Sequence, residues 1–342
     1  VGALMNASKM NASFAPCLPY RGKTALISQS GALLIALDMA SYPFHFGMSA
    51  MISNGNMADI SFADTINYFS RDQNTMSLAL YIEGLKDGRR FIEEGRKTNK
   101  PIVALKAGVS AHGAAAAASH TGSLAGAAKV YEGAFKQAHV LQANDLDELI
   151  QKSQVLSMLA PLQGDNILIV TNGGGIGVLA TDSAERHGLP LKSIPADLQE
   201  MMRKHMPDFG SPKNPVDITG QAGAQGYHGA IIDGLRHPWV NGLVVLYCET
   251  AVTNPLEIAD TVIKAIAESG VTNKPIVSAF VGGDLVTKAG VDMLQANIPM
   301  YLNPDKAMAS MAALRQRARF DAEGPEYNFT HKDVDLAAAR AI

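Results

Sequence analysis

The sequence predicts an α/β protein made of two consecutive doubly wound parallel-sheet domains. Three observations lead to this fold class. The chain has 342 residues, more than one domain of ordinary size needs. Short apolar runs alternate with amphipathic segments, which is typical of strands and helices in a parallel sheet. The alternation also starts afresh near residue 164, so we expect two similar halves.

The first half contains four strand-like runs and four helical patterns. The predicted strands are KTALIS (23–28), MSAMIS (48–53), SLALYIE (77–83) and PIVALKAG (101–108). The predicted helices cover 31–42, 59–70, 87–97 and 123–138. In the last of these, Leu124, Ala128, Tyr131 and Phe135 recur at helical spacing and form one apolar face.

The second half follows a Pro- and Gly-bearing linker at 157–165. Its predicted strands are 166–172, 242–248 and 275–280, and its predicted helices are 175–187, 196–205, 225–236, 254–269, 285–295 and 304–319. The two halves echo each other, because NKPIV occurs at both 99–103 and 273–277. We therefore expect flavodoxin-like domains at 22–160 and 161–320.

Composition excludes several classes of partner. Apolar residues make up 47% of the chain and the formal net charge is −3, with no long basic run. Nucleic acid and anionic membrane surfaces are therefore poor partners. No apolar run reaches the ~18 residues of a membrane span. The two cysteines, Cys17 and Cys248, have no metal-ligand or disulfide spacing, which fits a reducing compartment, and we expect a cytoplasmic protein with no metal site of its own.

Two turns follow apolar strands and open helices. Ligands in such sheets bind beyond the carboxyl ends of the strands, where helix N-termini attract anions. The candidate phosphate-binding residues are Ser28, Gln29, Ser30 and Gly31 in the first turn and Asn172, Gly173, Gly174 and Gly175 in the second. Small residues in each turn alone equally fit a tight connection, so the structural alternative stays open.

The second turn also contains Gly175-x-Gly177-x-x-Ala180, a form of the dinucleotide-binding fingerprint. The next strand-like piece, LPLKSI (189–194), carries no acidic residue to hold a ribose. A dinucleotide-dependent oxidoreductase is therefore the weaker alternative. No GxxxxGK[ST] phosphate loop occurs in the sequence.

A histidine and a glutamate complete the candidate site. Glu83 ends the apolar strand ALYIEG, where a carboxylate must be paired, hydrated or functional, and Lys106 is its candidate structural partner. His120 lies in AAAASHTGSLAG (115–126), on the edge that carries the two turns. A neutral imidazole is a good nucleophile near pH 7, and a carboxylate on its other ring nitrogen would orient it. An ordinary surface histidine is the alternative.

At these residues the sequence resembles the ADP-forming (NDP-forming) acyl-CoA synthetases, relatives of succinyl-CoA synthetase. The motifs are SQSGAL (28–33), GNMADIS (55–61), YIEG (81–84), KAG (106–108), AAASHTGSLAG (116–126), TNGGGIGVLATDSAERHGLPL (171–191) and NPVDITG (214–220). The resemblance runs from about residue 11 to residue 319. It implies that His120 is phosphorylated and passes its phosphoryl group to a nucleotide, and that Glu83 orients it. By the same resemblance Ser119, Thr121 and Gly122 join the phosphate-binding residues.

The resemblance also implies what lies outside these motifs. The reaction would be acid + CoA + ATP ⇌ acyl-CoA + ADP + phosphate, with Mg²⁺ accompanying the nucleotide. Residues 1–21 resemble the exit from a CoA-binding domain, and 321–342 resemble a linker toward an ATP-grasp domain or subunit. No residue of this chain is assigned to CoA, nucleotide or metal. We expect a homo- or hetero-oligomer that acts on a small carboxylic acid and phosphate.

One relative of different function remains as an alternative. The same domains occur in the acyl-CoA-sensing part of protein lysine acetyltransferases. Those relatives often lack the nucleophilic histidine, whereas this sequence keeps His120. The resemblance therefore favours the ligase.

Overall fold

The computed structural model describes residues 2–43, 45–110, 112, 113, 115 and 128–325. The first domain contains strands β1 (Ala3–Met5), β2 (Met10–Ala12), β3 (Arg21–Ser28), β4 (Met48–Ser53), β5 (Ser77–Ile82), β6 (Ile102–Lys106) and β7 (Val140–Ala143). Its helices are α1 (Gly31–Ser41), α2 (Phe62–Arg71), α3 (Gly88–Lys97), α5 (Ala128–Gln137) and α6 (Leu146–Met158).

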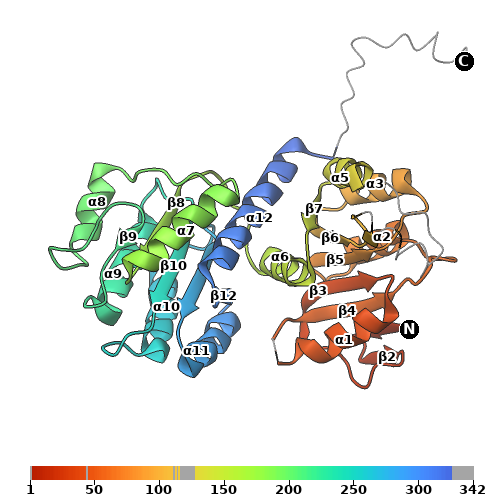
Figure 1. Cartoon of the computed structure of the whole chain (residues 1–342), viewed down its shortest axis with the longest axis horizontal. Coiled ribbons are helices and arrows are strands. Elements are labelled where there is room, and N and C mark those ends of the chain that lie inside the picture. The colour runs from red at the N-terminus through yellow and green to blue at the C-terminus, as the bar shows by residue number, and fades with distance from the viewer. Residues whose placement is uncertain (1, 44, 111, 114, 116–127, 326–342) are drawn as a thin grey trace, which may run out of the picture.

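The second domain repeats this alternation. Its strands are β8 (Ile167–Thr171), β9 (Val216–Asp217), β10 (Gly242–Cys248), β11 (Ile276–Val281) and β12 (Met300–Tyr301). Its helices are α7 (Gly174–Arg186), α8 (Ala196–Arg203), α9 (Gly223–Arg236), α10 (Pro255–Ser269), α11 (Asp284–Gln295) and α12 (Pro304–Glu323). Figure 1 shows the two domains side by side. The predicted fold class of two doubly wound parallel sheets is confirmed.

Both sheets have the same strand order over their parallel part. The first runs β4-β3-β5-β6-β7 and the second β9-β8-β10-β11-β12. The winding direction therefore reverses between β3 and β5 and again between β8 and β10. In open α/β sheets the crevice at this switch point, beyond the carboxyl ends of the strands, is where ligands bind.

Some elements have no counterpart in the sequence prediction. The strands β1 and β2 extend the first sheet in antiparallel pairing next to β4, although their Asn- and Ser-rich sequence shows no clear period. The strand β7 and helix α6 were also not predicted. Asp145 nevertheless caps α6, since its side chain accepts a hydrogen bond from the Glu148 backbone, and this acidic start was a readable helix signal.

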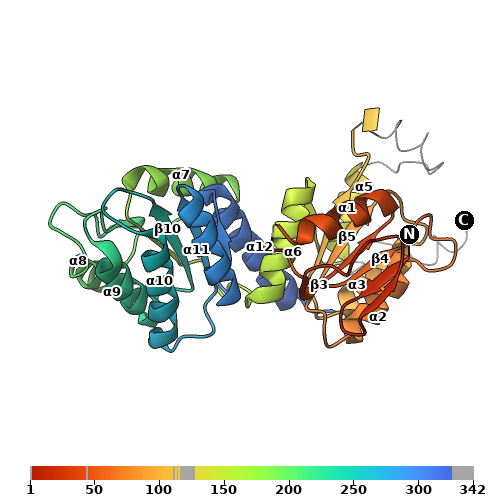
Figure 2. The same cartoon turned by 90° about the horizontal axis from the view of Figure 1, so that it is seen from below.

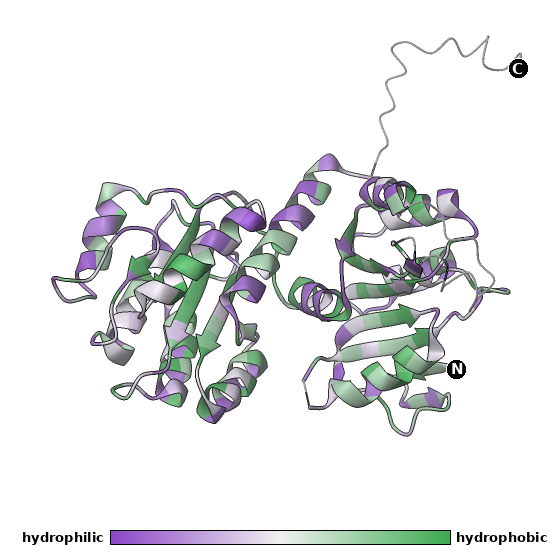
Figure 3. Cartoon of the chain, viewed as in Figure 1, coloured by the Kyte–Doolittle hydropathy of each residue, from purple (hydrophilic) through white to green (hydrophobic). Residues whose placement is uncertain are grey.

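Helices α6 and α12 lie between the two sheets, as Figures 1 and 2 both show. One apolar cluster joins the inner faces of both sheets through these helices, while separate clusters fill the outer faces. The strands are hydrophobic along much of their length in Figure 3, as expected for sheets covered on both sides. At the helix contact, the buried Gln151 side chain donates to the Lys306 carbonyl at 2.5 Å and to Ser310 Oγ at 3.0 Å.

The repeated NKPIV motif has a structural role. In each copy the lysine Nζ donates to two backbone carbonyls at the C-terminal end of the last helix but one before it. Lys100 binds the carbonyls of Phe69 and Asp72, and Lys274 binds those of Leu235 and His237. The repeat therefore marks equivalent positions in the two domains and caps helices α2 and α9.

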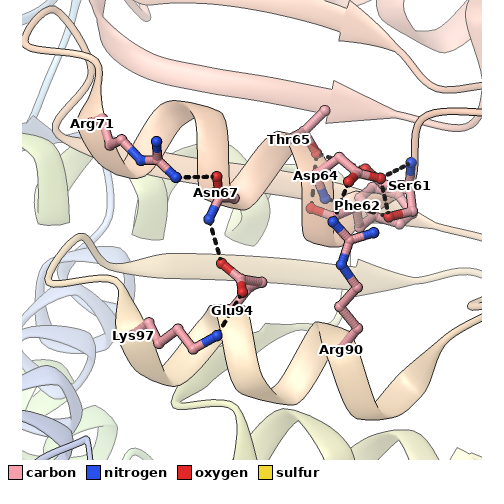
Figure 4. Close-up of polar contacts among 9 residues, drawn as sticks. All are labelled: Ser61, Phe62, Asp64, Thr65, Asn67, Arg71, Arg90, Glu94 and Lys97. Atoms are coloured by element: carbon pink, nitrogen blue, oxygen red, sulfur yellow. Dashed lines mark hydrogen bonds and ion pairs between the residues drawn. The ribbon is translucent and has the colours of Figure 1, made fainter.

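A polar network joins helices α2 and α3 on the surface (Figure 4). Ser61 caps α2 in a capping box, in which its hydroxyl accepts from the Asp64 backbone and the Asp64 carboxylate accepts from the Ser61 backbone at 2.9 Å. Arg90 also reaches Asp64, at 2.5 Å. The two Ser61 hydrogen bonds, followed by Arg90, lower the pKa of Asp64 to about 2.

Candidate functional site

The first predicted turn connects β3 to the N-terminus of α1, and a serine side chain forms two hydrogen bonds with the backbone of this turn. Ser28, the last residue of β3, donates its hydroxyl to the Ser30 carbonyl at 2.9 Å and accepts from the Ser30 backbone at 3.1 Å. The Ser30 side chain caps α1 by accepting from Leu33. None of the described residues accepts a hydrogen bond from the backbone of Gly31 or Ala32. These two N–H groups are available to an anion.

In the second turn a threonine side chain forms the same two hydrogen bonds with the backbone. Thr171 Oγ1 donates to the Gly173 carbonyl and accepts from the Gly173 backbone, both at 3.1 Å. Among the described residues, the backbone of Gly174 and Gly175 also finds no acceptor. However, Asp217 Oδ2 lies only 3.1 Å from where a Cβ on Gly174 would stand. A carboxylate therefore already occupies the space beside this helix opening, which makes it the less favourable anion site of the two.

The middle residue of each turn ties its helix opening to the neighbouring strand. Gln29 Oε1 accepts from the backbone of Glu83 at 2.6 Å and of Gly84 at 2.9 Å, just beyond β5. Asn172 does the same for β10, because its Oδ1 accepts from the Cys248 backbone at 2.8 Å and its Nδ2 donates to the Cys248 carbonyl at 2.9 Å. At both switch points a side-chain amide therefore joins the helix opening to the end of the neighbouring strand.

The hydrogen bond to Gln29 places Glu83 at the first switch point, just beyond the end of β5. Its backbone is fixed by Gln29, while its carboxylate is half-buried and has no hydrogen-bond or ion-pair partner among the described residues. The sheet register makes Cys248 its counterpart in the second domain. Burial raises the pKa of that thiol. At this one register position the first domain therefore has a carboxylate and the second domain a thiol.

The predicted pairing of Glu83 with Lys106 is wrong as a direct ion pair. Lys106 Nζ instead donates to the Ala107 carbonyl and lies 4.7 Å from the centre of the Tyr131 ring. The alternation of side chains along β6 turns the lysine toward the face covered by α3 and α5.

A groove of about 760 Å³ opens beside the first turn, on the side of α1 and α6. It is mostly apolar and is lined by Leu33, Tyr81, Leu105, Lys106, Ala107, Gly108, Val109, Asn144, Asp145, Leu146 and Asp147. The groove lies beside the carboxyl ends of β5 and β6, because Tyr81 and Lys106 are among its lining residues.

The structure brings Ser28, Gln29, Ser30, Gly31 and Glu83 together at one sheet edge. Asn172, Gly173, Gly174 and Gly175 lie at the corresponding edge of the second sheet, and no hydrogen bond or ion pair between described residues joins the two turns. The histidine assignment, with His120 and its neighbours Ser119, Thr121 and Gly122, lies outside the described residues.

The strand-like piece that the sequence predicts after the second turn, residues 189–194, is not a strand in the structure. Strand β8 pairs with β10 on one side and, on the other, with β9, which ends in the acidic Asp217. The segment that pairs with β8 comes from farther along the chain, and tertiary packing selects it. The absence of an acidic residue at 189–194 therefore does not exclude a dinucleotide.

Over the part of the chain that is described, no group of three or more His, Cys, Asp or Glu side chains is placed to hold a metal ion. No helix in that part is long and apolar enough to cross a membrane.

Family models match both domains. The succinyl-CoA ligase-like flavodoxin domain matches residues 21–156, and the ligase-CoA domain matches residues 167–323. Among curated relatives, the alpha subunit of ADP-forming acetate–CoA ligase I from Pyrococcus furiosus is 48% identical, over 95% of this chain and 70% of the relative. The alpha subunit of ligase II from the same organism is 39% identical, over 93% and 70% respectively.

A solved structure gives the same result. The acetyl-coenzyme A synthetase 1 of Ca. Korarchaeum cryptofilum, in complex with phosphate and ADP, superimposes with a TM-score of 0.90 at 38% identity. The match covers 94% of this chain and 70% of that chain. A longer relative, the ADP-forming acetate–CoA ligase of Methanocaldococcus jannaschii, is 37% identical over 92% of this chain, which spans only 45% of that relative.

Proposed function

The chain belongs to the ADP-forming acid–CoA ligase family, and we propose that it supplies the phosphohistidine and its binding crevice in the reaction acid + CoA + ATP ⇌ acyl-CoA + ADP + phosphate. Acetate is the proposed acid, because the relatives of 48% and 39% identity are named for it. The relatives reported above are ligases, which favours this function over an acyl-CoA sensor or an oxidoreductase.

In the direction of ATP formation, an oxygen of inorganic phosphate attacks the acyl carbon of acyl-CoA. The C–S bond breaks and CoA leaves as the thiol, taking one proton. A ring nitrogen of His120 then attacks the phosphorus of the acyl phosphate, and the carboxylate of the acid leaves. ADP finally takes the phosphoryl group from His120. Two transfers through a covalent intermediate replace one difficult transfer.

The observation that carries this proposal is the hydrogen bonding of Gln29 to the strand end at Glu83. It holds the opening of α1 beside the Glu83 carboxylate, and within the described part of the chain neither the two N–H groups at that opening nor the carboxylate has a hydrogen-bond partner. The helix opening suits the phosphoryl oxygens, and the carboxylate suits a ring nitrogen of the histidine. The groove beside Leu33 offers the acyl group an apolar wall.

We assign the remaining parts of the reaction outside the described residues. CoA, ATP/ADP and Mg²⁺ are the proposed cofactors, and the described residues include no cluster suited to Mg²⁺. The proposed partner is an ATP-grasp domain or subunit, since similar proteins are named as alpha subunits. A cytoplasmic oligomer is the proposed state.

Labelling with γ-³²P-ATP and Mg²⁺ tests the function on the complete ligase. We expect an acid-labile, base-stable label, as phosphohistidine gives, and no label on His120→Asn. The Asn variant must bind ADP as the wild type does, so that loss of label reports the nucleophile. Equal labelling of the two proteins would reject His120 as the phosphorylated residue.

A further inference from the structure

Lys106 is a buried charge at the carboxyl end of β6. The residue is only 3% exposed. Among the described residues, its Nζ makes one hydrogen bond, to the Ala107 carbonyl, and one contact with the Tyr131 ring. A lysine ammonium has three donors, so two of them find no acceptor there.

No carboxylate among the described residues forms an ion pair with this ammonium. Glu83 is near enough to act on Lys106 through space, but the two form no ion pair. Burial lowers the pKa of the Lys106 ammonium, and Glu83 opposes that effect. Buried charges in proteins are normally paired, because an uncompensated one is costly to desolvate. We therefore expect the Lys106 ammonium to bind an anion that the described residues do not supply.

The internal repeat shows that the fold itself does not need a charge here. The NKPIV alignment and the sheet register place Phe280 of β11 at the position equivalent to Lys106. Phe280 is fully buried and packs against Tyr247. By contrast, the lysines of the repeat, Lys100 and Lys274, are kept in both domains because each one caps a helix.

Lys106 also stands next to the proposed site. Ile82, the last residue of β5, pairs with Lys106, and Glu83 follows directly. Tyr131, whose ring the ammonium contacts, accepts a hydrogen bond from the Leu85 backbone at 3.1 Å, which holds it against the same strand end. The ammonium therefore lies beside the strand end that carries Glu83, on the face of the sheet covered by α3 and α5.

We propose that Lys106 binds the phosphoryl group of the ligase reaction, whether this group is presented as inorganic phosphate, as an acyl phosphate or on the histidine. The proposal rests on the function proposed above. The ammonium supplies the anion with charge-assisted hydrogen bonds from its two free donors.

Phosphate titration of the complete ligase by calorimetry tests this directly. We expect Lys106→Met and Lys106→Phe, the latter copying the second domain, to raise the Kd for inorganic phosphate about 10- to 100-fold. Lys100→Met is the matched control, because it removes a part-buried lysine on backbone carbonyls at the opposite end of β6. It should leave the phosphate Kd within twofold of the wild type.

Two labelling reactions distinguish the source of the phosphoryl group. If Lys106 holds phosphate or acyl phosphate, Lys106→Met loses labelling from acetyl-CoA plus ³²P-phosphate and keeps labelling from γ-³²P-ATP. If it holds the phosphohistidine, both reactions slow together. Either result supports the proposal.

A wild-type phosphate Kd in a folded Lys106 variant would overturn the proposal. So would failure of both variants to fold, since the charge would then be needed by the fold. The titration does not depend on His120. Labelling of His120→Asn would therefore reject the proposed function without deciding Lys106.

Discussion

The side-chain oxygen of Gln29 accepts a 2.6 Å hydrogen bond from the backbone nitrogen of Glu83, 54 residues away in the sequence. This bond joins the opening of α1 to the end of β5. The equivalent bond between Asn172 and Cys248 shows that the arrangement belongs to the fold. What is particular to the first domain is the carboxylate that the bond positions.

We predict that Gln29→Met slows phosphohistidine formation about tenfold. Methionine keeps the side-chain volume but leaves the N–H groups of Glu83 and Gly84 without an acceptor, at a cost of about 1–3 kcal/mol. Single-turnover labelling and thermal unfolding should be measured on the same preparation. An unchanged labelling rate per folded molecule would mean that the bond only stabilises the fold.

Glu83→Gln should slow labelling from γ-³²P-ATP by about 10² to 10³ and leave the melting temperature nearly unchanged. An amide keeps the shape but loses the charge that supports the imidazole, and the analogous swap in a serine-protease triad costs about 10⁴. The expected loss is smaller because the carboxylate also repels the phosphate. Stability should hold, since the carboxylate has no partner among the described residues. Normal labelling with a lower melting temperature would instead make Glu83 structural.

Asp64→Asn should lower the free energy of unfolding by about 1 kcal/mol at pH 7, since it weakens the capping box and the partly screened contact with Arg90. The pKa of Asp64 is about 2 in the folded chain and ~3.9 when unfolded. Its contribution is therefore complete above about pH 5 and is lost as the pH falls from 4 through 2. Urea unfolding of the wild type and the variant should show that the difference in their free energies of unfolding becomes smaller from pH 7 to pH 3. If this difference does not depend on pH, the lowered pKa of Asp64 does not contribute to stability as predicted.

Gln151→Leu should destabilise the contact between α6 and α12 by about 1–3 kcal/mol, because two buried hydrogen bonds are lost. Lys306→Gln is the control, since it removes only an exposed ion pair with Asp147 and should cost under about 1 kcal/mol. Urea unfolding measures both. Equal losses in the two variants would show that the buried side chain is not the main polar link.

The sequence predicted most of the fold because the relevant signals are local. Apolar runs of strand length, followed by small-residue turns and amphipathic helices, identified β3 with α1 and β8 with α7 in the right order. The strands β1 and β2 were missed because short edge strands carry little periodic signal. Residues 189–194 were misread as a strand because their apolar pattern alone does not decide which segment pairs with β8.

By itself, the sequence determined the two-domain α/β architecture, the family and the residues to inspect, since periodicity, turn chemistry and motifs are properties of neighbouring residues. Only the tertiary structure decided how those residues combine. Strand register joined Gln29 to Glu83, turned Lys106 away from Glu83 toward Tyr131, and placed Phe280 at the equivalent position in the other domain. These relationships depend on which distant strands pair and on which face each side chain leaves its strand, and both are set by packing of the whole sheet.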